Sequence, residues 1–263
     1  MNTLETICAN RKKQVEANKA LYPFALLEKS PYFQAEVVSL AHYLTRPGSS
    51  GVIAEFKRKS PSKGTINAYA DVKQTTISYM QGGAAALSVL TESDHFGGKD
   101  ADLTEARKAN YCPILRKDFI VDPYQIVEAR SIGADAILLI AAVHTKDSMQ
   151  SLYNTAIDLG LEILIEIHSE EELDKLPSGD FILGVNNRNL KTMEVELKTS
   201  LDMASKIDAS QTRISESGIH SPKDLITLRE AGYQGFLIGE AFMRTEEPGL
   251  ELARFVSSIK SMA

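Results

Sequence analysis

The sequence lacks the features of a disulfide-bonded secreted protein and of a membrane protein. It contains two cysteines, Cys8 and Cys112, which are too few for a disulfide framework and have no CxxC spacing. No apolar run reaches membrane-spanning length, and the N-terminal stretch MNTLETICANRKK has no signal-peptide core. Tryptophan is also absent, which excludes nothing. We therefore expect a reduced, cytoplasmic protein with no membrane partner.

Positive charge is in deficit. The 29 lysines and arginines are outnumbered by 35 aspartates and glutamates, for a net charge of −6. This balance argues against a general nucleic-acid partner, so an anionic ligand would need cations gathered locally. The 263 residues, 43% of them hydrophobic, are enough for one large α/β domain or two small ones.

Several motifs of common sites are missing as well. No GxGxxG or GxxxxGK[ST] follows an apolar run, and no GxSxG elbow is present for an acyl-transfer serine. His144, His168 and His220 belong to no HxH or HExxH pattern. We expect neither a catalytic metal nor a cofactor.

What the sequence does contain is a repeated alternation of short β-rich runs and amphipathic helical segments. Eight such runs in roughly 200 residues are typical of a (β/α)₈ TIM barrel, here a single domain over residues 1–263. A doubly wound open sheet is the alternative, and the missing phosphate loops count against it. The runs span residues 51–57, 85–92, 112–119, 134–142, 161–168, 181–188, 212–219 and 235–242.

Residues 1–50 precede the first run and are expected to form a helical extension. Leu4, Ile7, Cys8 and Val15 have roughly helical spacing, and RPGSSG at the end of the segment is typical of a linker. Two interpretations stay open: a plug packed on the barrel, and a lid over its active end.

Charged residues stand inside runs that should be buried. In GVIAEFK, the apolar Val52, Ala54 and Phe56 suit the helix-facing side, so Glu55 and Lys57 should point into the barrel. Barrel enzymes assemble their sites at the C-terminal ends of the strands, where these residues lie. The same alternation places further polar residues inward at that end, namely Lys117, Glu166, His168, Asn186, Arg188, Ser215 and Ser217.

The last two runs have features of a phosphate site. Gly218 precedes a helix that should begin at Ser221 and Pro222, and Gly239 precedes room for a short extra helix. We expect two helix N-termini here to offer unpaired N–H donors to a phosphate. Glu240 stands where the anion is expected, so its carboxylate should point away.

These residues indicate acid–base chemistry on a phosphorylated small molecule with further oxygen functions. Lysine can donate a proton, or act as an amine nucleophile if its pKa falls. The residues alone do not select a reaction. A Schiff-base aldolase built on Lys117 and a sugar-phosphate-binding scaffold without turnover stay as alternatives.

The chain resembles the indole-3-glycerol phosphate synthase family over essentially its whole length, including the helical extension. The resemblance implies a carboxy-lyase (decarboxylase) of tryptophan biosynthesis, with an anionic sugar phosphate as its small-molecule partner. Such an enzyme converts 1-(2-carboxyphenylamino)-1-deoxyribulose 5-phosphate to indole-3-glycerol phosphate, carbon dioxide and water. We expect a monomer. The motifs, in chain order, are IAEFKRKSPSKG, SVLTESDHFGG, PILRKDFIVDPYQI, GADAILLI, LIEIH, GVNNRNL, SESGI and LIGEAFM.

The resemblance also implies residue roles. Lys117 would be the general acid that protonates the ketone oxygen, and Glu166 and Lys57 would take part in the final dehydration. Phosphoribosylanthranilate isomerase, a similar barrel, uses a cysteine at the end of its first strand, where this chain has Lys57. The catalytic positions fall on Glu55, Lys57, Lys117, Glu166, Asn186 and Ser217. The substrate-binding positions fall on Ser60, Phe96, Phe119, Leu138, Arg188, Leu190, Gly218, Ile238 and Gly239.

Overall fold

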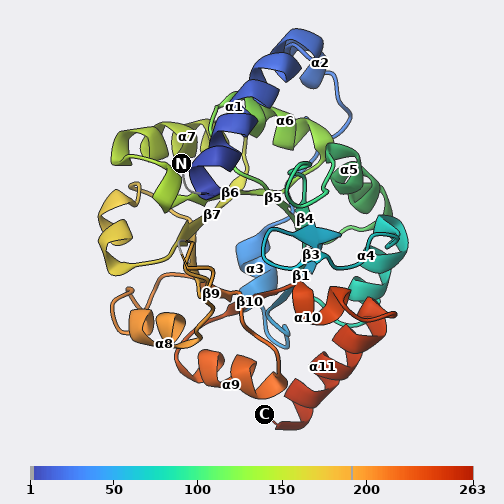
Figure 1. The fold of residues 1–263 in the computed structure, drawn as a ribbon, viewed down its shortest axis with the longest axis vertical. Helices are drawn as coiled ribbons and strands as arrows, with labels where there is room; N and C mark the ends of the chain where they lie inside the picture. The colour runs from blue at the N-terminus through green and yellow to red at the C-terminus, as the bar shows by residue number, and fades with distance from the viewer. Residues whose placement is uncertain (1–2, 191, 263) are drawn as a thin grey trace.

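The computed structural model describes residues 3–190 and 192–262. Eight parallel strands close into a barrel in the order β1-β10-β9-β8-β7-β6-β5-β4, with helices around it (Figure 1). The predicted (β/α)₈ barrel is therefore confirmed, and each predicted run contains one barrel strand. These strands are β1 (Val52–Phe56), β4 (Ala86–Leu90), β5 (Ile114–Lys117), β6 (Ala136–Ile140), β7 (Glu162–Ile167), β8 (Ile182–Asn186), β9 (Arg213–Glu216) and β10 (Gly235–Ile238).

The remaining elements surround the barrel or fill its loops. A short antiparallel pair, β2 (Lys59–Ser60) and β3 (Gly64–Thr65), forms the loop after β1. The helices before and between the first strands are α1 (Thr3–Leu21), α2 (Phe24–Leu27), α3 (Leu40–Thr45), α4 (Val72–Gln81), α5 (Asp100–Ala109) and α6 (Tyr124–Ile132). The later ones are η1 (Ala141–Val143), α7 (Lys146–Asp158), η2 (Glu170–Lys175), α8 (Lys198–Ala204), α9 (Pro222–Glu230), α10 (Glu240–Met243) and α11 (Pro248–Met262).

Alternation along the strands creates two apolar cores. Val52, Ala54 and Phe56 of β1 pack outward in the core between strands and helices. Ile53 of the same strand packs in a smaller core inside the barrel. Inward-facing positions beyond this inner core, toward the strand C-termini, are therefore left for polar side chains.

The N-terminal extension divides between the two ends of the barrel. Leu40 and Leu44 of α3 belong to the inner core and close the end where the strands begin. Figure 1 shows α3 near the barrel axis. Leu4 and Ile7 of α1 instead border the cavity at the opposite end. The plug interpretation therefore describes α3, whereas a lid role for α1 stays a prediction.

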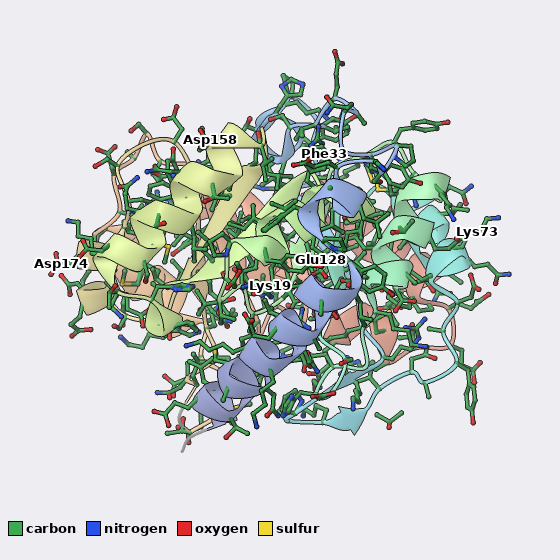
Figure 2. The ribbon with its side chains drawn as sticks, turned by 90° about the horizontal axis from the view of Figure 1, so that it is seen from above. Lys19, Phe33, Lys73, Glu128, Asp158 and Asp174 are labelled. Carbon is green, nitrogen blue, oxygen red and sulfur yellow. The ribbon has the colours of Figure 1, made fainter. Side chains whose placement is uncertain are left out.

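A row of polar contacts attaches α1 to the barrel. The guanidinium of Arg11 pairs with buried Asp118, which directly follows β5. Near the other end of α1, Lys19 Nζ lies 2.8 Å from Asp122 Oδ2 and Asn18 donates to Glu128 of α6. Figure 2 shows Lys19 on α1 beside Glu128. Specific side chains therefore hold α1 against the barrel.

The predicted facing of one strand is wrong. Ser215 of β9 was expected inside the barrel, but its hydroxyl is bonded to Asn187 and Ser200 on the helix-facing side. Ile214 belongs to the inner core, so Glu216 shares its inward face. This strand has polar side chains on both faces, so polarity alone could not choose between them.

Within the described residues, no helix is long and apolar enough to cross a membrane.

Candidate active site

The C-terminal ends of the barrel strands surround a cavity of about 530 Å³. All the residues assigned to the site from the sequence border this one cavity. Their roles stay predictions, because their shared location does not test what each one does. They are Glu55, Lys57, Ser60, Phe96, Lys117, Phe119, Leu138, Glu166, Asn186, Arg188, Leu190, Ser217, Gly218, Ile238 and Gly239.

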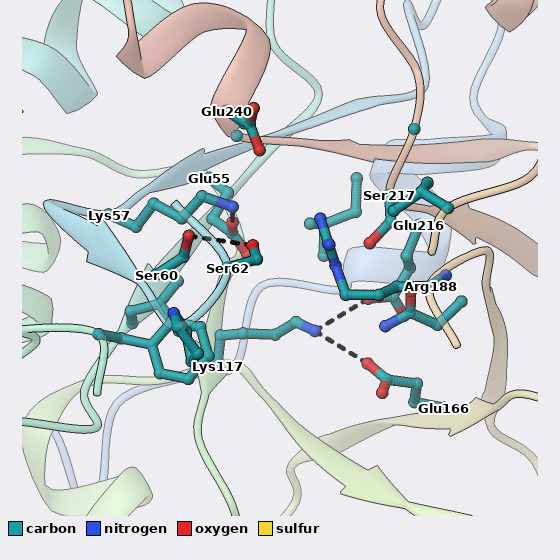
Figure 3. Close-up of a pocket in the computed structure, with 18 of the residues that line it drawn as sticks. Glu55, Lys57, Ser60, Ser62, Lys117, Glu166, Arg188, Glu216, Ser217 and Glu240 are labelled. Atoms are coloured by element: carbon teal, nitrogen blue, oxygen red, sulfur yellow. Dashed lines mark hydrogen bonds and ion pairs between the residues drawn. The ribbon is translucent and has the colours of Figure 1, made fainter. Parts of the chain in front are cut away.

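Lys117, the last residue of β5, lies between two carboxylates in the cavity (Figure 3). Its Nζ is 3.0 Å from Glu166 Oε2 and 2.9 Å from Glu216 Oε2. Burial alone would lower the pKa of Lys117, but Glu166, Glu216 and Glu55 raise it well above its ordinary value. Lys117 is therefore a charged ammonium at neutral pH, which suits a proton donor and not a free amine nucleophile.

The two carboxylates that share Lys117 have different proton affinities. Burial favours the protonated form of Glu166, but Lys117 and His168 hold its pKa well below the ordinary value. Burial also favours protonated Glu216, and with Glu166 nearby its pKa rises to about 7 in spite of Lys117. Two neighbouring acids whose pKa values are driven apart can hold and release a proton at neutral pH.

A second ion pair lies on β1. Lys57 Nζ is 2.6 Å from Glu55 Oε1, and the Glu55 side chain is almost fully buried. Buried charge of this kind is stable when it is paired. This pair explains how the barrel tolerates two charges in its first strand.

Two glycines make room for the carboxylates of Glu216 and Glu55. A Cβ atom at Gly184 of β8 would lie 2.4 Å from Glu216 Oε1. A Cβ atom at Gly239, after β10, would lie 2.5 Å from Glu55 Oε1. Both distances are too short for a non-bonded contact, so a Cβ atom at either position would displace the carboxylate.

Ser217 reaches the cavity through an unusual backbone conformation. Its φ of 67° turns the chain at the end of β9, and Gly218 follows with a φ of 76°. Buried Asn187 holds this turn: its side-chain amide donates to the Ser217 carbonyl, and its N–H donates to the Glu216 carbonyl. Positive φ at a non-glycine residue persists where neighbouring groups enforce it.

The predicted phosphate site differs in the structure at one of its two helix N-termini, that of α9. Before α9, Asp224 accepts from the N–H groups of His220 and Ser221, so these two donors are not free for a phosphate. The remaining candidates for anion binding are the turn at Gly218 and the start of α10 after Gly239. Glu240 still borders the cavity, and Lys63 Nζ lies 3.8 Å from its carboxylate and offsets its charge.

Apolar side chains form part of the cavity wall. The rings of Phe96 and Phe119 lie with their centroids 6.0 Å apart, next to Lys117 in the cavity lining. Ile7 of α1 completes this side and is only 3% exposed. A cavity with one apolar wall and several convergent charges suits a ligand that has an aromatic ring and anionic groups.

Glu216, Asn187 and Arg116 were not among the residues predicted from the sequence. Glu216 had a usable signal: an inward apolar residue followed two places later by glutamate recurs at Ile53 and Glu55 and at Leu164 and Glu166. Arg116 is fully buried behind Lys117 and bonds to Glu128 and Asp100 of the outer helices. No local pattern distinguishes a buried arginine of this kind from an exposed one.

The three histidines near this end of the barrel have separate partners. His144 is bonded to the Ile120 carbonyl, His168 lies between two glutamates, and His220 is at the cavity border. Across residues 3–190 and 192–262, no group of three or more His, Cys, Asp or Glu side chains is arranged to hold a metal ion.

Comparison with known proteins gives consistent results. A chain of the tryptophan synthase a2b2 complex from Pyrococcus furiosus superimposes with a TM-score of 0.57 at 16% identity, over 81% of this chain and 98% of that one, and supports the fold alone. Indole-3-glycerol phosphate synthase of Bordetella pertussis is 48% identical over 80% of each chain. The enzyme of that name from Bacteroides thetaiotaomicron is 42% identical over 98% of each. The family model for indole-3-glycerol phosphate synthase matches residues 4–255. The chain belongs to the indole-3-glycerol phosphate synthase family.

Proposed function

We propose that this cavity closes the indole ring of 1-(2-carboxyphenylamino)-1-deoxyribulose 5-phosphate, with loss of carbon dioxide and water, in tryptophan biosynthesis. The observation that carries the proposal is the position of Lys117. It is a buried, fully charged ammonium beside an aromatic wall, and it contacts two carboxylates of unequal proton affinity. A reaction that protonates a ketone and then removes a hydroxyl needs a donor and an acceptor in this arrangement.

In the first step, Lys117 donates its proton to the ketone oxygen as the carboxylated ring carbon attacks the ketone carbon. The phenyl ring rests on Phe96 and Phe119, which keep water away from the reacting atoms. Departure of carbon dioxide then restores aromaticity in the six-membered ring.

In the second step, the new hydroxyl leaves as water and a proton is lost to form the indole. Glu166 and Lys57 are assigned to these proton transfers, and Glu216, with its pKa of about 7, is a further candidate to return the proton to Lys117. Asn186 is assigned to hold a substrate hydroxyl or carboxylate. Ser60, Gly218 and Gly239 are assigned to the phosphate.

The direct test is to add the carboxyphenylamino-deoxyribulose phosphate to purified protein and follow indole fluorescence. We expect turnover that EDTA does not reduce. Loss of activity with EDTA that a divalent ion restores would overturn the assignment of a metal-free site. Borohydride with substrate separates the aldolase alternative, which requires a covalent adduct at Lys117.

Two further properties are proposed on the same basis. The family is one of biosynthetic enzymes, so we assign the protein to the cytoplasm. We also propose that it has no nucleic-acid partner. We propose further that it is a monomer, which light scattering at micromolar concentration would check. A mass of twice 28.9 kDa would contradict this assignment.

A further inference from the structure

His168, the residue that follows β7, lies between two carboxylates behind the cavity. Its Nε2 is 3.2 Å from Glu166 Oε1, and its Nδ1 is 3.6 Å from Glu172 Oε2 on η2. The same Glu172 oxygen accepts the His168 backbone N–H at 2.8 Å, which fixes the carboxylate against the ring. The histidine side chain is 11% exposed and does not border the cavity itself.

The contact extends the ion pairs of the site into a chain of alternating charge. Glu166 offers one oxygen, Oε2, to Lys117 and the other, Oε1, to His168. Lys117 in turn contacts Glu216. The order is therefore Glu172, His168, Glu166, Lys117, Glu216, negative and positive in alternation from the edge of the barrel to the cavity.

Two carboxylates beside a largely buried ring favour its charged form. Each ring nitrogen lies at ion-pair distance from a carboxylate oxygen, and neither contact is aligned as a hydrogen bond, so the attraction is between charges. Burial alone would lower the pKa of His168, but Glu166 and Glu172 raise it to about 9. The other charges of η2 are used elsewhere: Glu170 pairs with Lys206, and Lys175 donates to the Ala141 carbonyl.

We propose that His168 is a positioning residue that acts through Glu166. As an imidazolium it keeps Glu166 ionised and holds Oε1, so that Oε2 stays directed at Lys117. Glu172 sets the pH range over which His168 is charged. The inference rests on the proposed function, because its kinetic consequence needs Glu166 and Lys117 to transfer protons in turnover.

The consequence is a dependence of turnover on pH at the alkaline side. Below about pH 9 His168 is protonated, and its charge keeps Glu166 ionised and in position. Above about pH 9 the ring loses its proton, so a neutral ring lies between two carboxylates. We expect kcat to fall as pH rises through about 9, with little change in KM, because His168 does not border the cavity.

Two variants test this assignment. His168→Gln keeps a hydrogen-bond donor but has no charge, so kcat at pH 7.5 should fall at least about tenfold and the step near pH 9 should disappear. Glu172→Gln removes one carboxylate from the ring, so the step should remain but move down by about one pH unit or more. Glu171→Gln removes the same charge from the next, exposed position of η2 and is the matched control, as is His42→Gln on α3.

A measurement without substrate separates this inference from the proposed function. Ring ¹⁵N chemical shifts should show His168 doubly protonated at pH 7.5 in wild type, with a midpoint near 9 that Glu172→Gln lowers. A neutral ring at pH 7.5, or a His168→Gln variant with an unaltered pH profile, would overturn the inference. A charged ring in a protein that does not turn over the substrate would instead overturn the proposed function.

Discussion

Among single residues, Lys117 has the clearest consequence. Lys117→Met keeps stem length but has no proton to give, so ring closure should fall at least about a hundredfold while a substrate analogue still binds. The variant removes the ammonium between Glu166 and Glu216, and we expect one of the two carboxylates to take up a proton rather than the barrel to unfold. Circular dichroism checks the fold, and indole fluorescence under single-turnover conditions checks the chemistry.

Lys117→Arg is the informative companion. It retains the positive charge between the two carboxylates, but its planar guanidinium presents its N–H groups in a different geometry from the lysine ammonium. We therefore expect it to fail as well. An arginine variant with nearly full activity would mean that the site requires only charge, and the assignment of Lys117 as the acid would be wrong.

The raised pKa of Glu216 predicts that the stability of the folded protein depends on pH. Its pKa is raised by burial to about 7, so the folded protein binds a proton that the unfolded chain has lost, and stability declines as pH rises from about 4.5 through 7. Glu216→Gln resembles the protonated acid. Its melting temperature should match wild type near pH 5 and exceed it at pH 8, while turnover falls by about 10²–10⁴. Equal melting temperatures at both pH values would contradict the raised pKa.

Glu166→Gln tests the other carboxylate. Removing its charge and basicity should lower kcat by about 10²–10⁴, with a much smaller change in substrate binding. A tenfold loss of affinity with unchanged kcat would mark Glu166 as a binding residue instead.

At the scale of elements, a glycine lies in β8 and another directly follows β10, each where a carboxylate of the neighbouring strand needs space. Gly184→Ala places a Cβ against Glu216, and Gly239→Ala places one against Glu55. Displacing a reacting group by about 1 Å can cost about a hundredfold in rate, and we expect kcat losses of that order. Gly160→Ala is the control: nothing lies near its Cβ, but its φ of 71° costs about 1–2 kcal/mol of stability with no effect on kcat.

For the whole molecule, the notable feature is that one N-terminal extension serves both ends of the barrel. α3 closes the end where the strands start, and α1 borders the cavity. The pairing of Arg11 with Asp118 connects α1 to the residue that follows Lys117. We propose that α1 acts as a lid whose docked position depends on this pair.

Arg11→Met tests the lid. With the ion pair gone, α1 should dock more weakly, so KM should rise and limited proteolysis within residues 3–21 should be faster. Lys13→Met removes the same charge from an exposed position of α1 and should change neither. If Arg11→Met leaves both KM and the proteolysis rate at the wild-type values, α1 is a fixed wall rather than a lid.

The sequence by itself determined the barrel and most of its cavity. Glu55, Lys57, Lys117 and Glu166 could be placed because alternation along a strand is a local property, and apolar neighbours mark the outer face. The same rule failed at β9, where an arginine and a serine alternate with isoleucine and glutamate, so both faces have polar residues. Only the packed barrel decided that Glu216 points inward, because Asn187 and Ser200 satisfy Ser215 from outside.

Tertiary structure alone also decided the contacts between distant segments. The spacing of apolar residues predicted helices in residues 1–50. Whether each helix covers the cavity end of the barrel or the end where the strands begin depends on surfaces formed by residues far along the chain. The ring of His168 is charged because Glu166 and Glu172 converge on it, and the chain needs both the end of β7 and η2 to bring them together. Periodicity and turn chemistry are written in neighbouring residues, whereas ion pairs and their proton affinities depend on distances that exist only once the barrel has closed.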